Sequence, residues 1–235
     1  MHANLICVKS GSLYGDDYVK NLYDGVKRNT GIDFRFHVFT DDPSIGKHDS
    51  SWVIHRLPDW QLPQNKAWFY KIAVFDPSNG LDGRNLYIDL DCIILDDVSG
   101  FWEHGQSAFN ILQDFNRVYS PDFPGINSSI MCWTDDSMRY IYDQFLLDIP
   151  NNIRRYRGDQ DFIQAVSRGH SIFPTAWARS YRWEIWRGGI KDHKPDHYAI
   201  PGDEIVIPQD CRIAVFHGRP KPHEIQHAPL RALWG

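Results

Sequence analysis

Apolar and polar residues alternate along the first half of the chain in a pattern typical of strands joined by helices. An apolar run at residues 5–8 predicts a first strand, and an alternating segment at residues 34–40 predicts a second. Between them, apolar residues recur at helical spacing over residues 18–26, which predicts a helix that ends before Gly31. Because strand and helix follow one another in this way, we expect an α/β fold with a mostly parallel central sheet flanked by helices.

The pattern continues with a strand predicted at residues 53–57, a helix at residues 66–75 and a long strand at residues 85–95. The last of these is apolar on both faces, as a central strand of a parallel sheet should be. The second half is less regular, and residues 170–203 show no clean period. The elements expected there are strands at 108–112, 129–133 and 212–217 and helices at 136–147 and 159–167.

Composition narrows the class of protein. The chain has 235 residues, with 25 Lys and Arg against 30 Asp and Glu, so its net charge is −5 with neutral histidines. This acidic balance argues against a binder of duplex nucleic acid, which needs a basic surface. No apolar run approaches the roughly 20 residues that span a bilayer, and the first residues lack the apolar stretch of a signal peptide. We therefore expect a cytoplasmic protein, with peripheral membrane contact left open and all four cysteines buried as reduced thiols.

Two acidic residues interrupt the long predicted strand. Asp89 and Asp91 stand at i and i+2, so in a strand they point to the same face. Two such carboxylates repel each other and are costly to bury unless a cation lies beside them. They also stand toward the carboxyl end of the strand, where open α/β sheets bind ligands. Carboxylate oxygens suit Mg²⁺ or Mn²⁺, which keep coordination positions for a diphosphate. An ordinary strand that runs into a turn can carry the same pair.

The flanking residues make the pattern more specific. Residues 86–97, LYIDLDCIILDD, resemble the strand and D-x-D motif of GT-A fold glycosyltransferases, particularly the family 8 type. Residues 39–42, FTDD, are similar to the nucleotide-side loop of such enzymes. Three later segments resemble family blocks in the family's order, namely INSSIMCW at 126–133, GDQD at 158–161 and FHGRPKP at 216–222.

This resemblance implies a GT-A fold and a metal-dependent enzyme. The enzyme would transfer a sugar from a nucleotide sugar, a UDP-sugar in this interpretation, to a saccharide or another hydroxyl acceptor, with retention of configuration. Asp91 and His217 would hold Mn²⁺ or Mg²⁺, and Asp89 would share the metal or hold the ribose. Lys221 would contact the donor diphosphate.

The resemblance also implies the rest of the site. Asp159 and Gln160 would be the catalytic residues, facing the transferred sugar near its anomeric carbon. The other substrate-binding residues would be Asp41 or Asp42 near the base or ribose, Lys71 on the sugar, and Asn127 and Ser128 on the acceptor or sugar side. A single domain would span residues 1–235, with a nucleotide-binding half at about 1–100 and an acceptor and sugar half at about 101–235.

Other functions remain open at this point. A nucleotidyltransferase of the same architecture usually has a Gly-rich phosphate loop after its first strand, where this chain has the sparser GSLYG at residues 11–15. A phosphohydrolase built on Asp89 and Asp91 fits their mid-chain position poorly. A catalytically silent sugar- or partner-binding module would use the Trp-rich back half of the chain, which includes residues 177–190.

Three features have structural as well as functional interpretations. Asp159 follows a glycine and fits a helix N-cap as well as a catalytic role. The tryptophans Trp177, Trp183 and Trp186 are expected either to pack or to form an acceptor-binding lip. The HEIQH sequence at residues 223–227 matches a zinc-protease pattern, but the prolines on both sides leave too little room for the helix that this pattern needs.

Overall fold

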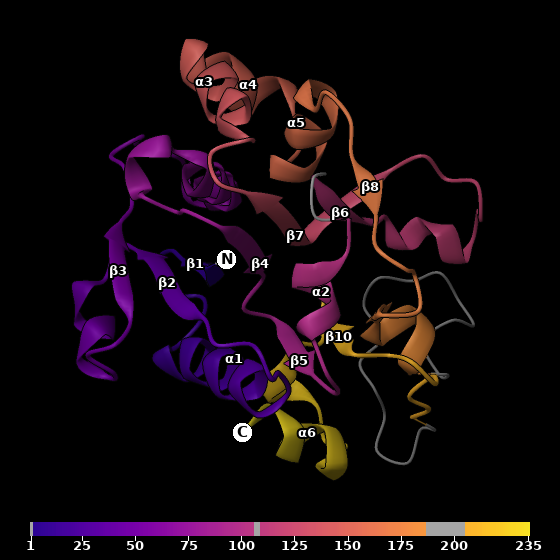
Figure 1. Cartoon of the computed structure of the whole chain (residues 1–235). Coiled ribbons are helices and arrows are strands. Elements are labelled where there is room, and N and C mark those ends of the chain that lie inside the picture. The colour runs from indigo at the N-terminus through magenta and orange to yellow at the C-terminus, as the bar shows by residue number, and fades with distance from the viewer. Residues whose placement is uncertain (1, 106–108, 187–204) are drawn as a thin grey trace.

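A computed structural model of the chain describes residues 2–105, 109–186 and 205–235. These residues form a seven-stranded sheet in the order β3-β2-β1-β4-β7-β6-β8 (Figure 1). The neighbours from β3 to β4 pair in parallel, whereas β7 runs antiparallel to both β4 and β6. The expected α/β fold with a mostly parallel sheet is therefore confirmed. The strands are β1 (Ala3–Lys9), β2 (Arg35–Thr40), β3 (Val53–Arg56), β4 (Arg84–Ile88), β6 (Asn110–Gln113), β7 (Ile126–Thr134) and β8 (Ser171–Ile172).

Residues 85–95, predicted as one strand, are divided between two sheets, so that prediction is wrong. After β4 ends, the chain turns and re-enters an extended conformation as β5 (Cys92–Ile94). In the described residues, β5 pairs antiparallel with β10 (Ile213–Val215), which pairs in parallel with β9 (Ala178–Ser180). The apolar pattern cannot reveal this division, because both halves of the run are fully buried.

The D-x-D segment therefore lies at the junction of the two sheets. Asp89 donates its backbone N–H to the carbonyl of Ser129 at 2.8 Å, which keeps it attached to the large sheet. The carbonyl of Asp91 accepts from the N–H of Phe216 at 2.9 Å, next to the small sheet. The two carboxylates are thus carried on a turn that is held at both ends.

Apolar side chains from both faces of the large sheet form two cores. Leu86 and Ile88 of β4 enter one core, whereas Tyr87 between them enters the other. This alternation is what a strand covered on both faces requires. The first face carries α1 (Asp16–Arg28), α2 (Ser99–Glu103), α6 (Ala228–Trp234) and the small sheet, and the second carries η2 (Gln64–Phe75), α3 (Arg139–Leu147) and α5 (Asp159–Val166).

Helix α1 illustrates how the sequence produces its local structure. Its buried residues Val19, Leu22 and Val26 recur at helical spacing, and the helix begins with two acidic residues and ends with two basic ones, which suits its dipole. Gly25 allows the close approach to β5, because a Cβ there would lie 3.1 Å from Ile94. Figure 1 shows α1 beside α6, with α3, α4 (Ile149–Arg155) and α5 gathered at the other end of the molecule.

The helix predicted at residues 66–75 is present as η2, a 3₁₀ helix rather than an α-helix. With three residues per turn, side chains at i and i+3 align along one side. Helix η2 ends where a turn begins at Asp76. In this turn the Asp76 carboxylate accepts a hydrogen bond from the N–H of Ser78 at 2.9 Å. One side of η2 therefore presents Trp68 and Lys71 together.

Other predictions differ mainly at element ends. Helix α3 begins at Arg139 rather than at residue 136, and residue 108 of the strand expected at 108–112 lies outside the described residues. All four cysteines are free and buried, as expected. No helix in the described ranges is long and apolar enough to cross a bilayer. The remaining short helices are η1 (Pro43–Lys47), η3 (Pro77–Asn79), η4 (Phe115–Val118), η5 (Tyr181–Ile185) and η6 (Pro222–Glu224).

Candidate active site

A cavity of about 570 Å³ opens where the loop after β1, η2, the D-x-D turn, β7, α5 and the residues after β10 meet. Most residues expected at the site from the sequence line it. They are Lys71, Asp89, Asp91, Asn127, Ser128, Asp159, Gln160 and His217. These residues are spread along the chain from position 71 to position 217, so the fold brings the predicted blocks together.

Lys71 connects two of these blocks. Its ammonium nitrogen lies 3.1 Å from Oδ1 of Asp89, 2.9 Å from Oδ2 of Asp159 and 3.1 Å from Oγ of Ser128. Burial acts to lower the pKa of Lys71, but the carboxylates of Asp159 and Asp89 outweigh it and raise this pKa above its ordinary value. Lys71 therefore stays cationic in the wall of the cavity.

Asp89 is also held by a residue that the sequence analysis did not select. The hydroxyl of Tyr87 donates to Oδ1 of Asp89 at 2.6 Å. Burial raises the pKa of Asp89, whereas the ammonium of Lys71 works in the opposite direction. Side chains two residues apart in a strand point to the same face, so the spacing of Tyr87 and Asp89 in the sequence was a signal for this contact.

Asp91 is paired with a second lysine. Lys221 places its ammonium 2.5 Å from Oδ2 of Asp91, and the hydroxyl of Tyr14 donates to the same oxygen at 3.0 Å. Gly218 has a φ of +74°, a conformation that favours glycine, and lies in the segment that joins His217 to Lys221. The Tyr14 contact joins positions 77 residues apart, so no local pattern predicts it.

The imidazole of His217 packs between aromatic rings. It stacks on Phe115 with centroids 5.0 Å apart and meets the edge of Trp183 at 4.5 Å, and its Nε2 lies 2.7 Å from the hydroxyl of Ser180. Burial, assisted by the positive charge of Arg182, lowers the pKa of His217 to about 3, so the ring is neutral near pH 7. Phe115 is itself buried, so the stacked pair belongs to the packed interior beside the cavity.

The three residues expected to bind a metal line one cavity but do not form a compact metal centre. Among the described residues, no group of three His, Cys, Asp or Glu side chains lies close enough together to hold an ion. Asp91 is paired with Lys221, Asp89 with Lys71, and His217 with Ser180. Two carboxylates and a neutral imidazole on one cavity are nevertheless donors that fit Mn²⁺ or Mg²⁺.

The GDQD block at residues 158–161 forms another part of the cavity wall. Gly158, not Asp159, is the N-cap residue of α5, and no side chain caps this helix, so the interpretation of Asp159 as a cap is wrong. Its Oδ2 instead accepts from Oγ of Ser128 at 2.7 Å and contacts Lys71. This carboxylate faces the cavity from the first turn of the helix.

Two neighbours fix the side-chain amide of Gln160. Its Nε2 donates to Oδ2 of Asp114 at 2.7 Å, and its Oε1 accepts from Nδ2 of Asn127 at 3.2 Å. Asn127 is itself held, because its Oδ1 accepts from the N–H of Ser129 at 3.0 Å. The amide therefore has one defined orientation, and Asp114 is a residue of this network that sequence reasoning missed.

Asp41 and Asp42 are not among the residues that line the cavity. Oδ2 of Asp41 accepts from the N–H of Gly11 at 2.9 Å, and Gly11 lines the cavity in the loop after β1. Asp42 caps η1 by accepting from the N–H of Ser44 at 2.9 Å, and this hydrogen bonding lowers the pKa of Asp42. Asp41 thus shapes the loop, and neither carboxylate is on the described wall.

The tryptophan side chains of the Trp-rich stretch pack against other residues. Trp186 is buried, and Trp177 lies under the guanidinium of Arg212 at 4.1 Å, while Trp183 meets His217. Residues 187–190 of the proposed lip lie outside the described part of the chain.

The HEIQH sequence has no zinc-site helix. Only its first two residues belong to the short helix η6. The Glu224 carboxylate accepts from the N–H of Lys221 at 2.6 Å, and the His227 ring caps α6. This agrees with the sequence argument against a metalloprotease.

The GT-A fold that the sequence resemblance implies agrees with the comparisons. No family model matches the sequence, and no curated protein matches it. Solved structures do match, among them an active-site mutant of LgtC, with a TM-score of 0.68 and 12% identity over 98% of this chain and 94% of that one. The galactosyltransferase LgtC in complex with donor and acceptor sugar analogues gives a TM-score of 0.64 at 12% identity, over 99% of this chain and 95% of that one.

Two further structures share the fold. GlyE of Streptococcus pneumoniae TIGR4, a glycosyltransferase, gives a TM-score of 0.66 at 14% identity over all of this chain, which spans 60% of GlyE. Mouse xyloside xylosyltransferase 1 gives 0.58 at 14% identity over 92% of this chain and 98% of that one. The chain is therefore similar to glycosyltransferases in fold, at identities that carry the fold alone.

Proposed function

We propose that the protein is a metal-dependent glycosyltransferase that moves a sugar from a UDP-sugar to a hydroxyl acceptor with retention of configuration. One observation carries the proposal: the D-x-D turn, the GDQD block and the residues after β10 line one cavity around Lys71. The fold shared with LgtC, whose structure holds donor and acceptor sugar analogues, supports a sugar-transfer reaction. The whole chain would act as one domain, since residues of both halves line the cavity.

The donor diphosphate would lie at the Asp91 end of the cavity. Lys221 and the Tyr14 hydroxyl already converge on Oδ2 of Asp91, so this end supplies a cation and a hydrogen-bond donor. Lys221 would turn its ammonium toward the phosphate oxygens and stabilise the charge that grows as UDP leaves. A Mn²⁺ or Mg²⁺ ion held by Asp89, Asp91 and His217 would supply Lewis-acid stabilisation of the same charge.

The sugar would lie at the Gln160 end. Asn127 and Asp114 hold the Gln160 amide, and Asp159 is charge-balanced by Lys71. Gln160 and Asp159 would stabilise positive charge at the anomeric carbon as its bond to the diphosphate breaks. The acceptor hydroxyl would then bond through its oxygen to that carbon on the face from which UDP leaves and would give its proton to the departing diphosphate, so no strong base is required on the opposite face.

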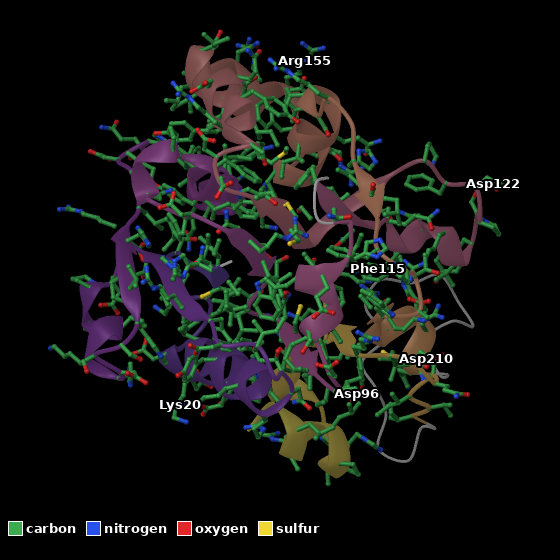
Figure 2. The ribbon with its side chains drawn as sticks, in the orientation of Figure 1. Lys20, Asp96, Phe115, Asp122, Arg155 and Asp210 are labelled. Carbon is green, nitrogen blue, oxygen red and sulfur yellow. The ribbon has the colours of Figure 1, made fainter. Side chains whose placement is uncertain are left out.

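Release of UDP from a panel of UDP-sugars, with Mn²⁺ and with EDTA, tests the proposal. We expect turnover with at least one donor. EDTA should abolish this activity, and Asp91→Asn should reduce it about a hundredfold or more, because a charged contact in the transition state is lost. Asp122→Asn is the matched control, because Asp122 is exposed and lies at the periphery (Figure 2). Saccharide binding without turnover of any donor would favour the silent sugar-binding module instead.

A further inference from the structure

Trp68 differs from the other tryptophans of the chain. It is 47% exposed and lines the cavity. Within the described ranges it has neither a ring contact nor a hydrogen bond, whereas Trp60, for example, stacks on Tyr70 with centroids 5.9 Å apart. An indole is a large apolar surface that normally finds partners in a folded protein. Trp68 is thus an unpartnered ring at the mouth of the candidate active site.

The position of this ring is defined by its own helix. Trp68 precedes Lys71 by three residues in the 3₁₀ helix η2, so the two side chains lie on the same side of it. Gln64, at the start of the same helix, is exposed and lines the cavity as well. Helix η2 therefore presents an amide, an indole and an ammonium to the cavity.

A glycine on the opposite segment makes room for the indole. A Cβ at Gly158 would lie 3.3 Å from Nε1 of Trp68, which is tighter than ordinary packing. Gly158 has φ −155° and ψ 178°, an extended conformation that any residue adopts, so the backbone does not require glycine there. The lack of a side chain instead lets Trp68 stand directly beside the segment that carries Asp159 and Gln160.

The indole of Trp68 lies toward the sugar end of the cavity rather than toward the diphosphate end. Lys71 contacts Asp89 on one side and Asp159 on the other, so it lies between the diphosphate end and the sugar end. Trp68 stands next to Gly158, on the Asp159 side, and the Tyr14 and Lys221 contacts are on the Asp91 side. A group stacked on Trp68 would therefore lie at the sugar end of the cavity, beside the segment that carries Asp159 and Gln160.

We propose that Trp68 is the platform on which a pyranose ring of a saccharide acceptor stacks, with the Gln64 amide bonding its hydroxyl groups. This inference rests on the proposed function. The C–H face of a pyranose is flat and apolar, and its hydroxyls point outward, so it matches an exposed indole beside an amide. Pockets of this kind combine an aromatic wall with a few polar groups that fix orientation. Trp68 is thereby a specificity-determining residue for the acceptor.

Binding of lactose, maltose and cellobiose in the presence of UDP and Mn²⁺ tests the platform. Wild type, Trp68→Ala and Trp68→Phe would be compared by calorimetric titration, with UDP binding measured separately for each. We expect at least one disaccharide to bind wild type, Trp68→Ala to weaken it about tenfold or more, and Trp68→Phe, which keeps a ring, to weaken it less. The dissociation constant for UDP should change less than about twofold.

Leu147→Ala is the matched control, because Leu147 is 75% exposed on α3 and does not line the cavity. It removes exposed apolar surface and should leave both affinities unchanged. Equal binding of the disaccharide to Trp68→Ala and to wild type would overturn the platform. So would UDP binding to wild type with no disaccharide bound at all, an outcome that leaves the proposed function standing. Failure of UDP to bind any variant would instead remove the proposed function and the platform together.

Discussion

The ammonium of Lys71 lies 2.9 Å from Oδ2 of Asp159, and both side chains are less than one-tenth exposed, at 8% and 9%. This pair joins η2 to the first turn of α5 across the cavity. Since Lys71 also contacts Asp89, one buried cation serves two carboxylates. The candidate active site is thus tied together by a charge network as well as by apolar packing.

Replacing Lys71 tests this network. Lys71→Met keeps the length of the side chain but leaves the buried Asp159 and the partly exposed Asp89 without their cation, and breaking a buried ion pair typically costs about 3–5 kcal/mol. We expect a clear fall in the urea midpoint and loss of UDP release. Lys20→Met, at an exposed i,i+4 pair on α1, should change stability by no more than about 0.5 kcal/mol. Adding Asp159→Asn to Lys71→Met should restore part of the lost stability, and an unchanged urea midpoint for Lys71→Met would refute the network.

Lys221 is predicted to recognise the diphosphate rather than the nucleoside. Its ammonium lies 2.5 Å from Oδ2 of Asp91, from where it would turn toward phosphate oxygens bound at that end of the cavity. Lys221→Met should weaken UDP binding about tenfold or more, as expected for a lost charge-assisted contact, and should leave uridine binding unchanged. Lys47→Met, at an exposed position on η1, is the control. Equal losses for UDP and uridine would show that Lys221 acts on the fold instead.

Asp114 is predicted to be a positioning residue for Gln160. It accepts from Nε2 of Gln160 at 2.7 Å through Oδ2, while its Oδ1 caps η4 by accepting from Asn116. Asp114→Asn keeps an oxygen for the cap but replaces the acceptor with a donor, so the Gln160 amide loses its fixed orientation. We expect kcat to fall about tenfold or more with little change in the donor KM. A rise in donor KM at constant kcat would contradict this role.

Stability should depend on pH through a buried histidine away from the cavity. Nε2 of His37 lies 3.2 Å from Oδ1 of Asn4, and its Nδ1 lies 2.9 Å from Nε2 of His55. Burial, with His55 and Arg35 nearby, lowers the pKa of His37 from 6.5 to about 4. Between these values the unfolded chain binds more protons than the folded one, so stability is full above pH 6.5 and falls as the pH drops toward 4.

The measurement is the urea midpoint above pH 6.5 and midway toward pH 4. His37→Gln should reduce the difference between the two conditions, because the side chain that titrates has been removed. His2→Gln, at an exposed position, should leave the difference as it is in wild type. An undiminished pH dependence in His37→Gln would show that other groups account for it.

The sequence predicted the parts of the fold that depend on local pattern. The apolar spacing of α1 and the alternation of β2 gave elements within about two residues of their ends. It did not reveal that the run around Asp89 and Asp91 is shared by two sheets, because strand partners far along the chain decide where a buried segment pairs. The short elements α2, α4, α6, β8 and β9 were not predicted, since each has too few residues for a clear period.

The candidate site was also predictable only in part. The D-x-D and GDQD blocks could be selected because the candidate residues within each block lie next to one another in the sequence. The partners that hold them could not, since Tyr14 reaches Asp91 and Asp114 reaches Gln160 over long stretches of chain. Trp68 was one aromatic residue in a predicted helix, and only its exposure in the fold distinguishes it from a core residue.

Thermal unfolding with UDP, with and without Mn²⁺, tests the central claim most directly. A ligand that binds only the folded state at a hundredfold excess over its Kd adds about 2.7 kcal/mol of apparent stability. UDP with Mn²⁺ should therefore raise the melting temperature of wild type and of Asp122→Asn, and should do so much less for Asp91→Asn. If UDP stabilises Asp91→Asn as much as wild type, or stabilises neither, the cavity at the D-x-D turn is not the nucleotide site.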